Sequence, residues 1–275
     1  MSSTTQRYKA ISNSTVDSYN VTETDEYQFG CEFEFYIDIE KYDFKDAIER
    51  IKNKLQAFTN ADILVDLSNL PIEDDKNHCI QIKPDQSLKS NGIEISIPIT
   101  SQAGVNHYIC HILPLIEEFG YTNEDTGLHF HISTIKNDGV NFPFYVFMLM
   151  CHDKNLLSSW EPRLEYSQNV MDILLSNTKS KARVIKTKKG TIWNLEKLES
   201  NHIEIKSMGG IDYHRKLNKI LEEFNQYTQC FDQVYKNTDT QYRSKLIEEH
   251  NKLVSSTDKT TLEEFAIAVK EAGIQ

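Results

Sequence analysis

The chain has 275 residues, 39% of them hydrophobic, and its 41 acidic against 30 basic side chains give a formal net charge of −11. This length and composition predict a folded protein with a large core, and the acidic balance argues against binding of nucleic acid, whose affinity rests mainly on Lys and Arg. The five cysteines form no Cys-x-x-Cys pair, so neither a zinc knuckle nor a dithiol redox site is indicated. Without a secretory signal or an apolar run of bilayer length, we expect a cytoplasmic protein with no membrane partner.

Residues 1–25 are polar and lack hydrophobic periodicity, which predicts a disordered tail, and a single domain is expected over 26–275. Period-two runs predict strands, in chain order, at 30–35, 62–67, 78–83, 92–98, 127–133 and 202–206. Helical spacing predicts helices at 44–58, with Asp43 as N-cap, and at 102–119, 143–157, 162–175, 213–235, 241–254 and 261–272. This order of elements predicts an α+β fold, in which an antiparallel or mixed sheet has helices covering one face.

Four of the predicted strands carry a carboxylate or an imidazole at every second residue. In the first, Glu32 and Glu34 share the face opposite Cys31, Phe33 and Phe35, because successive side chains of a strand point to opposite faces. The same count separates the following residues from their apolar neighbours: Glu94, His129, His131 and Glu204. If the strands join one sheet, so many carboxylates on one face would repel each other unless cations held them together. The pattern therefore predicts a metal site.

Each motif alone has a simpler interpretation. Two acids on one strand face are typical of a half-exposed strand with solvated carboxylates, and two imidazoles at that spacing are compatible with ordinary polar strand residues or with a cupin-like zinc or iron site. The long helical C-terminal third argues against a cupin barrel. The basic stretch at 179–189 suits either a solvated surface loop or a loop that meets phosphates.

In chain order, the motifs together resemble the amidoligase family, the carboxylate–amine ligase branch of the glutamine synthetase and glutamate–cysteine ligase superfamily. The matching segments are Gly-x-Glu-x-Glu-Phe at 30–35, Asp-Gln-Ser-Leu at 85–88 leading into Gly-Ile-Glu-Ile-Ser-Ile-Pro at 92–98, Thr-Gly-Leu-His-Phe-His-Ile-Ser at 126–133, and Ile-Glu-Ile-Lys at 203–206. The likeness runs from about residue 27 to residue 216. It implies an α+β fold with a curved, mainly antiparallel sheet of the superfamily type.

The resemblance implies an ATP- and Mg²⁺-dependent (or Mn²⁺-dependent) ligase that forms an amide bond between a carboxylate and an amine through an acyl phosphate. Its substrates would be small molecules or peptides, and the chain would be a possible homo-oligomer. In such ligases the metal ions on the sheet neutralise the transferring phosphoryl group, so catalysis is mostly positioning and charge stabilisation.

The resemblance also assigns roles to individual residues. One ion would be held by Glu32, His129 and Glu204, and another by Glu34 and Glu94 with support from Asp85. His131 would approach the ATP phosphates. Arg163 corresponds to a phosphate-binding or acyl-phosphate-binding arginine of the family, and Lys186 or Lys188 are the substitutes if that alignment slips. The catalytic residues would be Glu34, Arg163 and Lys206.

Lys206 is the main departure from the family pattern. The family motif usually ends Glu-Phe-Arg at this strand, and a lysine keeps the charge of the arginine but loses its bidentate geometry. The departure leaves open a second hypothesis, that the chain is a catalytically degenerate relative that binds nucleotide or serves as a structural protein. The C-terminal helices are expected to form either a wall of the acceptor pocket or an oligomer interface.

Overall fold

The computed structural model describes residues 26–68, 78–134, 147, 150–151, 156, 160, 192–194 and 202–236. Backbone contacts divide the chain into two compact units, residues 1–135 with 208–221, and residues 136–207 with 222–275. The tail at 1–25 and the helices expected at 162–175, 241–254 and 261–272 lie outside the described residues, as does most of the helix expected at 143–157. The single-domain organisation stays a prediction.

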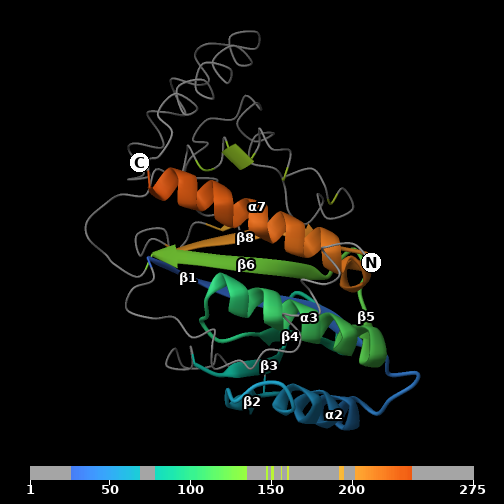
Figure 1. Cartoon of the computed structure of the whole chain (residues 1–275). Helices are drawn as coiled ribbons and strands as arrows, with labels where there is room; N and C mark the ends of the chain where they lie inside the picture. Colours follow the sequence, from blue (N-terminus) through green and yellow to red (C-terminus); the bar gives the residue numbers. More distant parts are fainter. Residues whose placement is uncertain are drawn as a thin grey trace, which may run out of the picture. The chain divides into compact units, whose positions relative to one another are not determined.

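The first unit contains an open sheet built around its longest strand, β1. The strands are β1 (Tyr27–Ile37), β2 (Ile63–Val65), β3 (Ile80–Pro84), β4 (Gly92–Ser96), β5 (Gly120–Tyr121) and β6 (Gly127–Thr134). They are ordered β2-β3-β4-β1-β6, with β5 paired to the end of β1 (Figure 1). All these pairs are antiparallel except β2 with β3. The expected mix of helices with a mainly antiparallel sheet is confirmed.

Two helices of the first unit begin where the sequence places a capping side chain. Asp43 accepts hydrogen bonds from the backbone N–H groups of Lys45 and Asp46 at the start of α2 (Phe44–Gln56), as expected for an N-cap. Ser101 caps α3 (Gln102–Phe119) in the same way, and α3 has the bounds predicted from its periodicity. Helix α3 packs against β1 and against α2.

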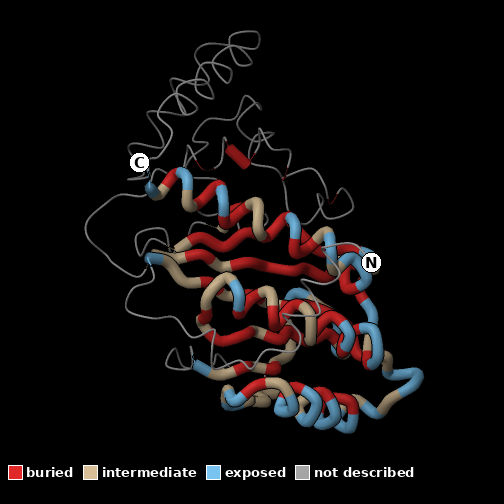
Figure 2. Tube along the Cα trace, viewed as in Figure 1, coloured by how far each residue is buried: buried red, intermediate tan, exposed pale blue. Residues whose placement is uncertain are grey.

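The core of the first unit is made by the apolar residues that alternate along the strands (Figure 2). Phe33, Phe35, Ile95, Leu128 and Phe130 are all fully buried, with no exposed surface. Burial of large apolar side chains contributes roughly 1.5–3 kcal/mol each, so the register of the strands is held firmly. Because that register sends the apolar residues to one face, the acids and imidazoles between them must share the other.

The described part of the second unit includes a short antiparallel pair, β7 (Trp193–Asn194) with β8 (His202–Gly209), in which Trp193 lies opposite Ile205. The Trp193 ring packs against the Phe147 and Tyr227 rings, with centroids 5.3 and 6.2 Å apart. The last two residues of β8 belong to the first unit.

The helix expected at 213–235 is divided in two. It begins as a 3₁₀ turn, η4 (Tyr213–Arg215), and the α-helix α7 starts only at Leu217 and ends at Tyr235. Asp212 precedes the turn with a positive φ of 54°, a left-handed conformation that interrupts regular structure at this point. No helix among the described residues is long and apolar enough to cross a membrane.

Candidate metal centre on the polar face of the sheet

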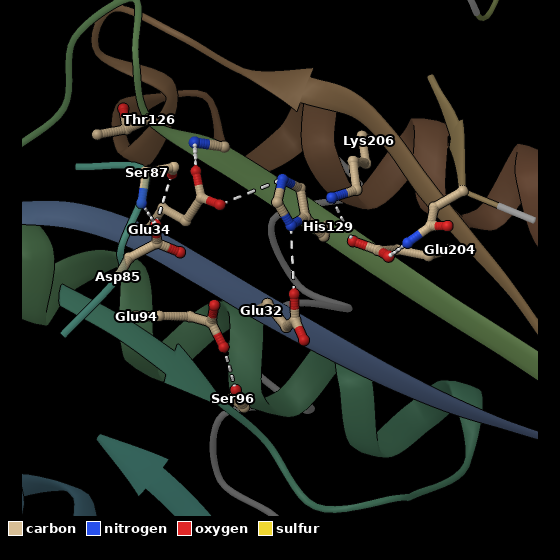
Figure 3. Close-up of polar contacts among 12 residues, drawn as sticks. Glu32, Glu34, Asp85, Ser87, Glu94, Ser96, Thr126, His129, Glu204 and Lys206 are labelled. Atoms are coloured by element: carbon tan, nitrogen blue, oxygen red, sulfur yellow. Dashed lines mark hydrogen bonds and ion pairs between the residues drawn. The ribbon is translucent and has the colours of Figure 1, made fainter. Parts of the chain in front are cut away.

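The register of β1 with its two neighbours sets the acids and imidazoles in rows across the sheet. Glu34 lies directly opposite Glu94 of β4, and Glu94 lies in turn opposite Lys83 of β3. One rung along β1, Glu32 lies opposite Ser96 on one side and His129 of β6 on the other. The period-two pattern of the sequence therefore does bring these side chains to one face of the first unit (Figure 3).

Three carboxylates form a close group on this face. One oxygen each from Glu34, Asp85 and Glu94 lies within 4.8 Å of the other two. Opposite ligands of an octahedral Mg²⁺ are about 4.2 Å apart, because each bond is about 2.1 Å long. Adjacent ligands of the same ion are about 3.0 Å apart, so the three oxygens have to draw closer together to ligate one ion. Hard carboxylate oxygens are the ligands that such ions prefer.

Hydrogen bonds from the backbone hold two members of this group, Glu34 and Asp85, in place. The Gly127 N–H donates to Glu34 Oε2 at 2.6 Å, and the Tyr213 hydroxyl donates to the Glu34 carbonyl oxygen at 2.9 Å. Asp85 follows β3 and accepts a hydrogen bond from the Ser87 N–H at 2.6 Å, which fixes its carboxylate in the loop. Glu34 is 3% exposed and Glu94 is 6% exposed, so neither carboxylate is solvated in the usual way.

Glu32 sits between two imidazoles. His129 Nδ1 is 3.2 Å from Glu32 Oε2, and His131 Nε2 is 3.2 Å from Glu32 Oε1. Burial acts to raise the pKa of Glu32, but the charge and hydrogen bonds of His131 and His129 outweigh burial and hold that pKa well below its usual range. His129 Nε2 also approaches Glu34 Oε1 at 3.4 Å and so links the two acids of β1.

Glu94 behaves in the opposite way. Burial and, second, the charge of Glu32 raise the pKa of Glu94 to about 7, although the Lys83 ammonium at 3.0 Å and a hydrogen bond from Ser96 oppose the rise. The protein's own cations therefore do not fully compensate the negative charge of this row. A group of carboxylates that retains a proton near neutral pH fits a divalent cation, which would displace that proton.

Glu204 lies in the second unit, on β8. Asn194 Nδ2 donates to Glu204 Oε2 at 2.5 Å, and Lys206 Nζ is 2.9 Å from Glu204 Oε1 (Figure 3). Lys206 therefore shares the strand face of Glu204, as their spacing in the sequence predicts. That Glu204 shares an ion with Glu32 and His129 stays a prediction. Arg163, Lys186 and Lys188 lie outside the described residues.

Sequence reasoning missed several partners of the acids, among them Lys83 and the Gly127 N–H. Lys83 was not distinguished from other strand lysines, although it alternates with Ile80 and Ile82 and so belongs to the polar face. The Gly127 N–H cannot be seen in a side-chain pattern at all. The alternation could have placed Lys83 on the polar face, but only the strand pairing sets it opposite Glu94.

No protein-family model and no curated protein sequence matches the chain. Among solved structures, the cryo-EM structure of Plasmodium falciparum glutamine synthetase is similar over 83% of this chain and 55% of that chain, with 11% identity and a TM-score of 0.37. A structure of apo GmaS without ligand is similar over 97% of this chain and 72% of that chain, with 9% identity and a TM-score of 0.32. The chain spans about half the length of the glutamine synthetase. Both are weak structural neighbours, so the chemistry of the chain is argued from its own residues.

Proposed function

We propose that the chain is an ATP- and Mg²⁺-dependent (or Mn²⁺-dependent) ligase that joins a carboxylate to an amine through an acyl phosphate. The observation that supports it most is the group of three carboxylates within 4.8 Å, Glu34, Asp85 and Glu94, on the same sheet face as Glu32 and the two imidazoles. This donor set suits hard divalent ions, and its chain order resembles the amidoligase motifs. The proposal includes the curved sheet of that superfamily and a cytoplasmic location.

The proposed reaction has two steps. A carboxylate oxygen of the acid attacks the γ-phosphorus of ATP, and ADP leaves with the electrons of the broken P–O bond. The amine nitrogen then attacks the carbonyl carbon of the acyl phosphate, inorganic phosphate leaves, and the nitrogen loses a proton to give the amide. Neither step needs a covalent bond to the protein, so the side chains have to position the reactants and offset developing charge.

The residues of the candidate metal centre each have a role in the proposed reaction. Glu34, Asp85 and Glu94 would hold one Mg²⁺, and Glu32 and His129, together with Glu204, would hold another. The bound ions would offset the charge on the phosphoryl oxygens. His131 pairs with the Glu32 carboxylate and would approach the ATP phosphates, while Lys206 supplies a cation beside Glu204. Arg163, with Lys186 and Lys188, is proposed to contact the transferred phosphate.

Turnover of ATP with a mixed pool of acids and amines tests the proposal. Full-length protein, Mg²⁺ and ATP should yield ADP together with a product whose mass equals one acid plus one amine less one water. Glu34→Gln keeps the size of the side chain and removes a charged ligand, so it should abolish turnover. Glu40→Gln, an exposed acid just beyond β1, is the matched control and should keep the wild-type rate. Equal turnover by Glu34→Gln and wild type would falsify the role of this group.

A second candidate function is a nucleotide-binding protein without turnover. It is favoured by the contacts of the Glu204 carboxylate, because Asn194 donates a hydrogen bond to one of its oxygens and the Lys206 ammonium pairs with the other. A carboxylate neutralised by a neighbouring ammonium is a weaker metal ligand, because the ion must compete with that cation. Binding of ATP and Mg²⁺ with no ADP formed from any acid and amine pool would favour this function over the ligase.

A further inference from the structure

The polar face of the sheet continues past the carboxylates to a pair of stacked tyrosines. Tyr36 follows Glu32 and Glu34 at the same period of two, so it lies on their face of β1. It is opposite Tyr121 of β5, and the two rings stack with centroids 5.4 Å apart and planes 18° apart. Tyr36 is 2% exposed, whereas Tyr121 is 45% exposed and so offers aromatic surface to solvent beside the carboxylates.

A loop places a further carboxylate against this pair. Tyr121 lies opposite Tyr36 and Leu128 lies opposite Phe33. The two β1 residues 34–35 therefore face the six residues 122–127, and the extra residues form a loop between β5 and β6. Asp125 in this loop accepts a hydrogen bond from the Tyr36 hydroxyl at 3.4 Å. That hydroxyl also accepts a hydrogen bond from the Lys89 N–H, so both of its roles are used.

Hydrogen bonds within the loop and from a neighbouring segment hold the loop in place. Asn123 Oδ1 accepts a hydrogen bond from the Asp125 N–H at 3.0 Å, and Thr126 Oγ1 accepts one from the Asn123 N–H at 3.1 Å. From outside, the Gly210 N–H donates to the Thr126 carbonyl oxygen at 2.8 Å. The loop ends at Gly127, whose N–H donates to Glu34. Asp125 is thus positioned by the same segment that orients a carboxylate of the proposed metal centre.

Exposed apolar surface gathers at this end of β1. The large hydrophobic side chains that are exposed in the described part of the chain are Tyr121, Ile39 at 58% and Ile211 at 50%. Ile39 comes two residues after β1 ends, and Ile211 lies between Gly210 and Asp212, whose N–H groups donate to the two ends of the loop. Exposed apolar side chains that lie together commonly mark a contact surface, so these three side chains are a candidate contact surface for a ligand.

The charges along the face favour a cation at the tyrosine end. The imidazoles lie around Glu32, and the acids Glu34, Glu94 and Asp85 lie on the side toward Tyr36 and Asp125. Lys83 is engaged by Glu94 at 3.0 Å. An anionic group such as phosphate is therefore favoured at the imidazole end, and a cation against an aromatic face and a carboxylate is favoured at the other.

We propose that Tyr36, Tyr121 and Asp125 form a binding site for an organic ammonium ion with an apolar alkyl or aryl tail. The Asp125 carboxylate pairs with the ammonium group, the open face of Tyr121 covers it by a cation–π contact, and the apolar surface around the loop receives the tail. We assign this ammonium ion as the amine substrate, and that assignment rests on the proposed ligase function. The binding of an ammonium ion at this site does not depend on that function.

Calorimetric titration of the Mg²⁺-loaded full chain with n-butylammonium chloride, without ATP, tests the site. Tyr121→Leu removes the aromatic face at similar size and should weaken binding about fivefold, whereas Tyr121→Phe keeps the ring and should bind as the wild type does. Asp125→Asn should weaken binding about tenfold. n-Butanol, which has the tail without the charge, should bind at least about tenfold more weakly than n-butylammonium.

The control variant is Asp46→Asn, which removes an exposed carboxylate of α2 and should leave binding unchanged. The inference is overturned if Tyr121→Leu and Asp125→Asn bind the probe like the wild type, or if n-butanol binds equally well. If the variants lose binding while no acid and amine pool gives ATP turnover, the ammonium site stands and the ligase function fails. If turnover is present and the variants neither lose the probe nor raise the KM for amine, the site alone fails.

Discussion

Substitution Glu94→Gln tests the charge balance of the metal centre through the pH dependence of stability. The pKa of Glu94 rises from 4.5 to about 7 in the folded protein, first because the group is buried and second because Glu32 is charged. The folded state then binds a proton more tightly than the unfolded state. The contribution of Glu94 to the free energy of unfolding is therefore greatest below pH 4.5 and falls as pH rises toward 7.

The size of the effect follows from the same pKa. At about 1.4 kcal/mol for each tenfold change in proton affinity, a rise from 4.5 to about 7 corresponds to about 3 kcal/mol between acid and neutral pH. Glu32 has the opposite sign, because its pKa is lowered; its contribution is present above pH 4.5 and is lost as pH falls through its folded-state pKa. The difference between wild type and Glu94→Gln isolates the contribution of Glu94.

Urea unfolding in EDTA at pH 5, 6, 7 and 8 gives the measurement. The free energy of unfolding of the wild type, relative to Glu94→Gln, should decline by about 3 kcal/mol at most over this range and level off near pH 8. Saturating Mg²⁺ should remove most of the decline, since the ion binds the ionised carboxylates. A difference that stays constant with pH, or that grows as pH rises, would refute the uncompensated charge at Glu94.

Three further predictions concern single residues. Glu34→Gln should weaken Mg²⁺ binding at least about tenfold in calorimetric titration, and Glu40→Gln should not; equal affinities would contradict the ligand role. Gly209→Ala should lower the free energy of unfolding by about 2 kcal/mol, because φ is +133° and a Cβ atom would lie 2.6 Å from the Thr126 carbonyl oxygen; an unchanged urea midpoint would contradict it. In a working ligase, Lys206→Ala should lower turnover about a hundredfold and Lys206→Arg should retain much of it; unchanged turnover by Lys206→Ala would exclude a phosphate contact.

Local patterns predicted the elements that carry the site. The alternation around Glu32 and Glu34 fixes which side chains share a face whatever the strand pairs with, because the period of a strand is a local property. The helix start at Asp43 and the bounds of α3 also depend on neighbouring residues, namely a capping side chain and an apolar stripe. These features were predicted correctly from sequence.

Pairing register and loop geometry could not be predicted in the same way. That Glu34 lies opposite Glu94, and not opposite Ser96, is set by contacts between residues about 60 apart in the chain. The loop that carries Asp125 was not predicted. The sequence between β5 and β6 does not show which residues of β1 pair with each of these strands, so it does not show how many residues form the loop. The pKa of Glu94 has the same origin, since it depends on burial and on the rung that Glu32 occupies.

Glu32 and Glu94 belong to adjacent rungs of one sheet face, yet their pKa values move in opposite directions. The difference is one of partners: two imidazoles surround Glu32, whereas Glu94 has one lysine and a charged neighbour of its own sign. Two imidazoles thus keep Glu32 ionised at one end of the face, whereas burial and the charge of Glu32 favour the protonated form of Glu94 at the other. An ion at Glu34, Asp85 and Glu94, as we propose, would take the place of the proton on Glu94, so metal uptake would release that proton near neutral pH.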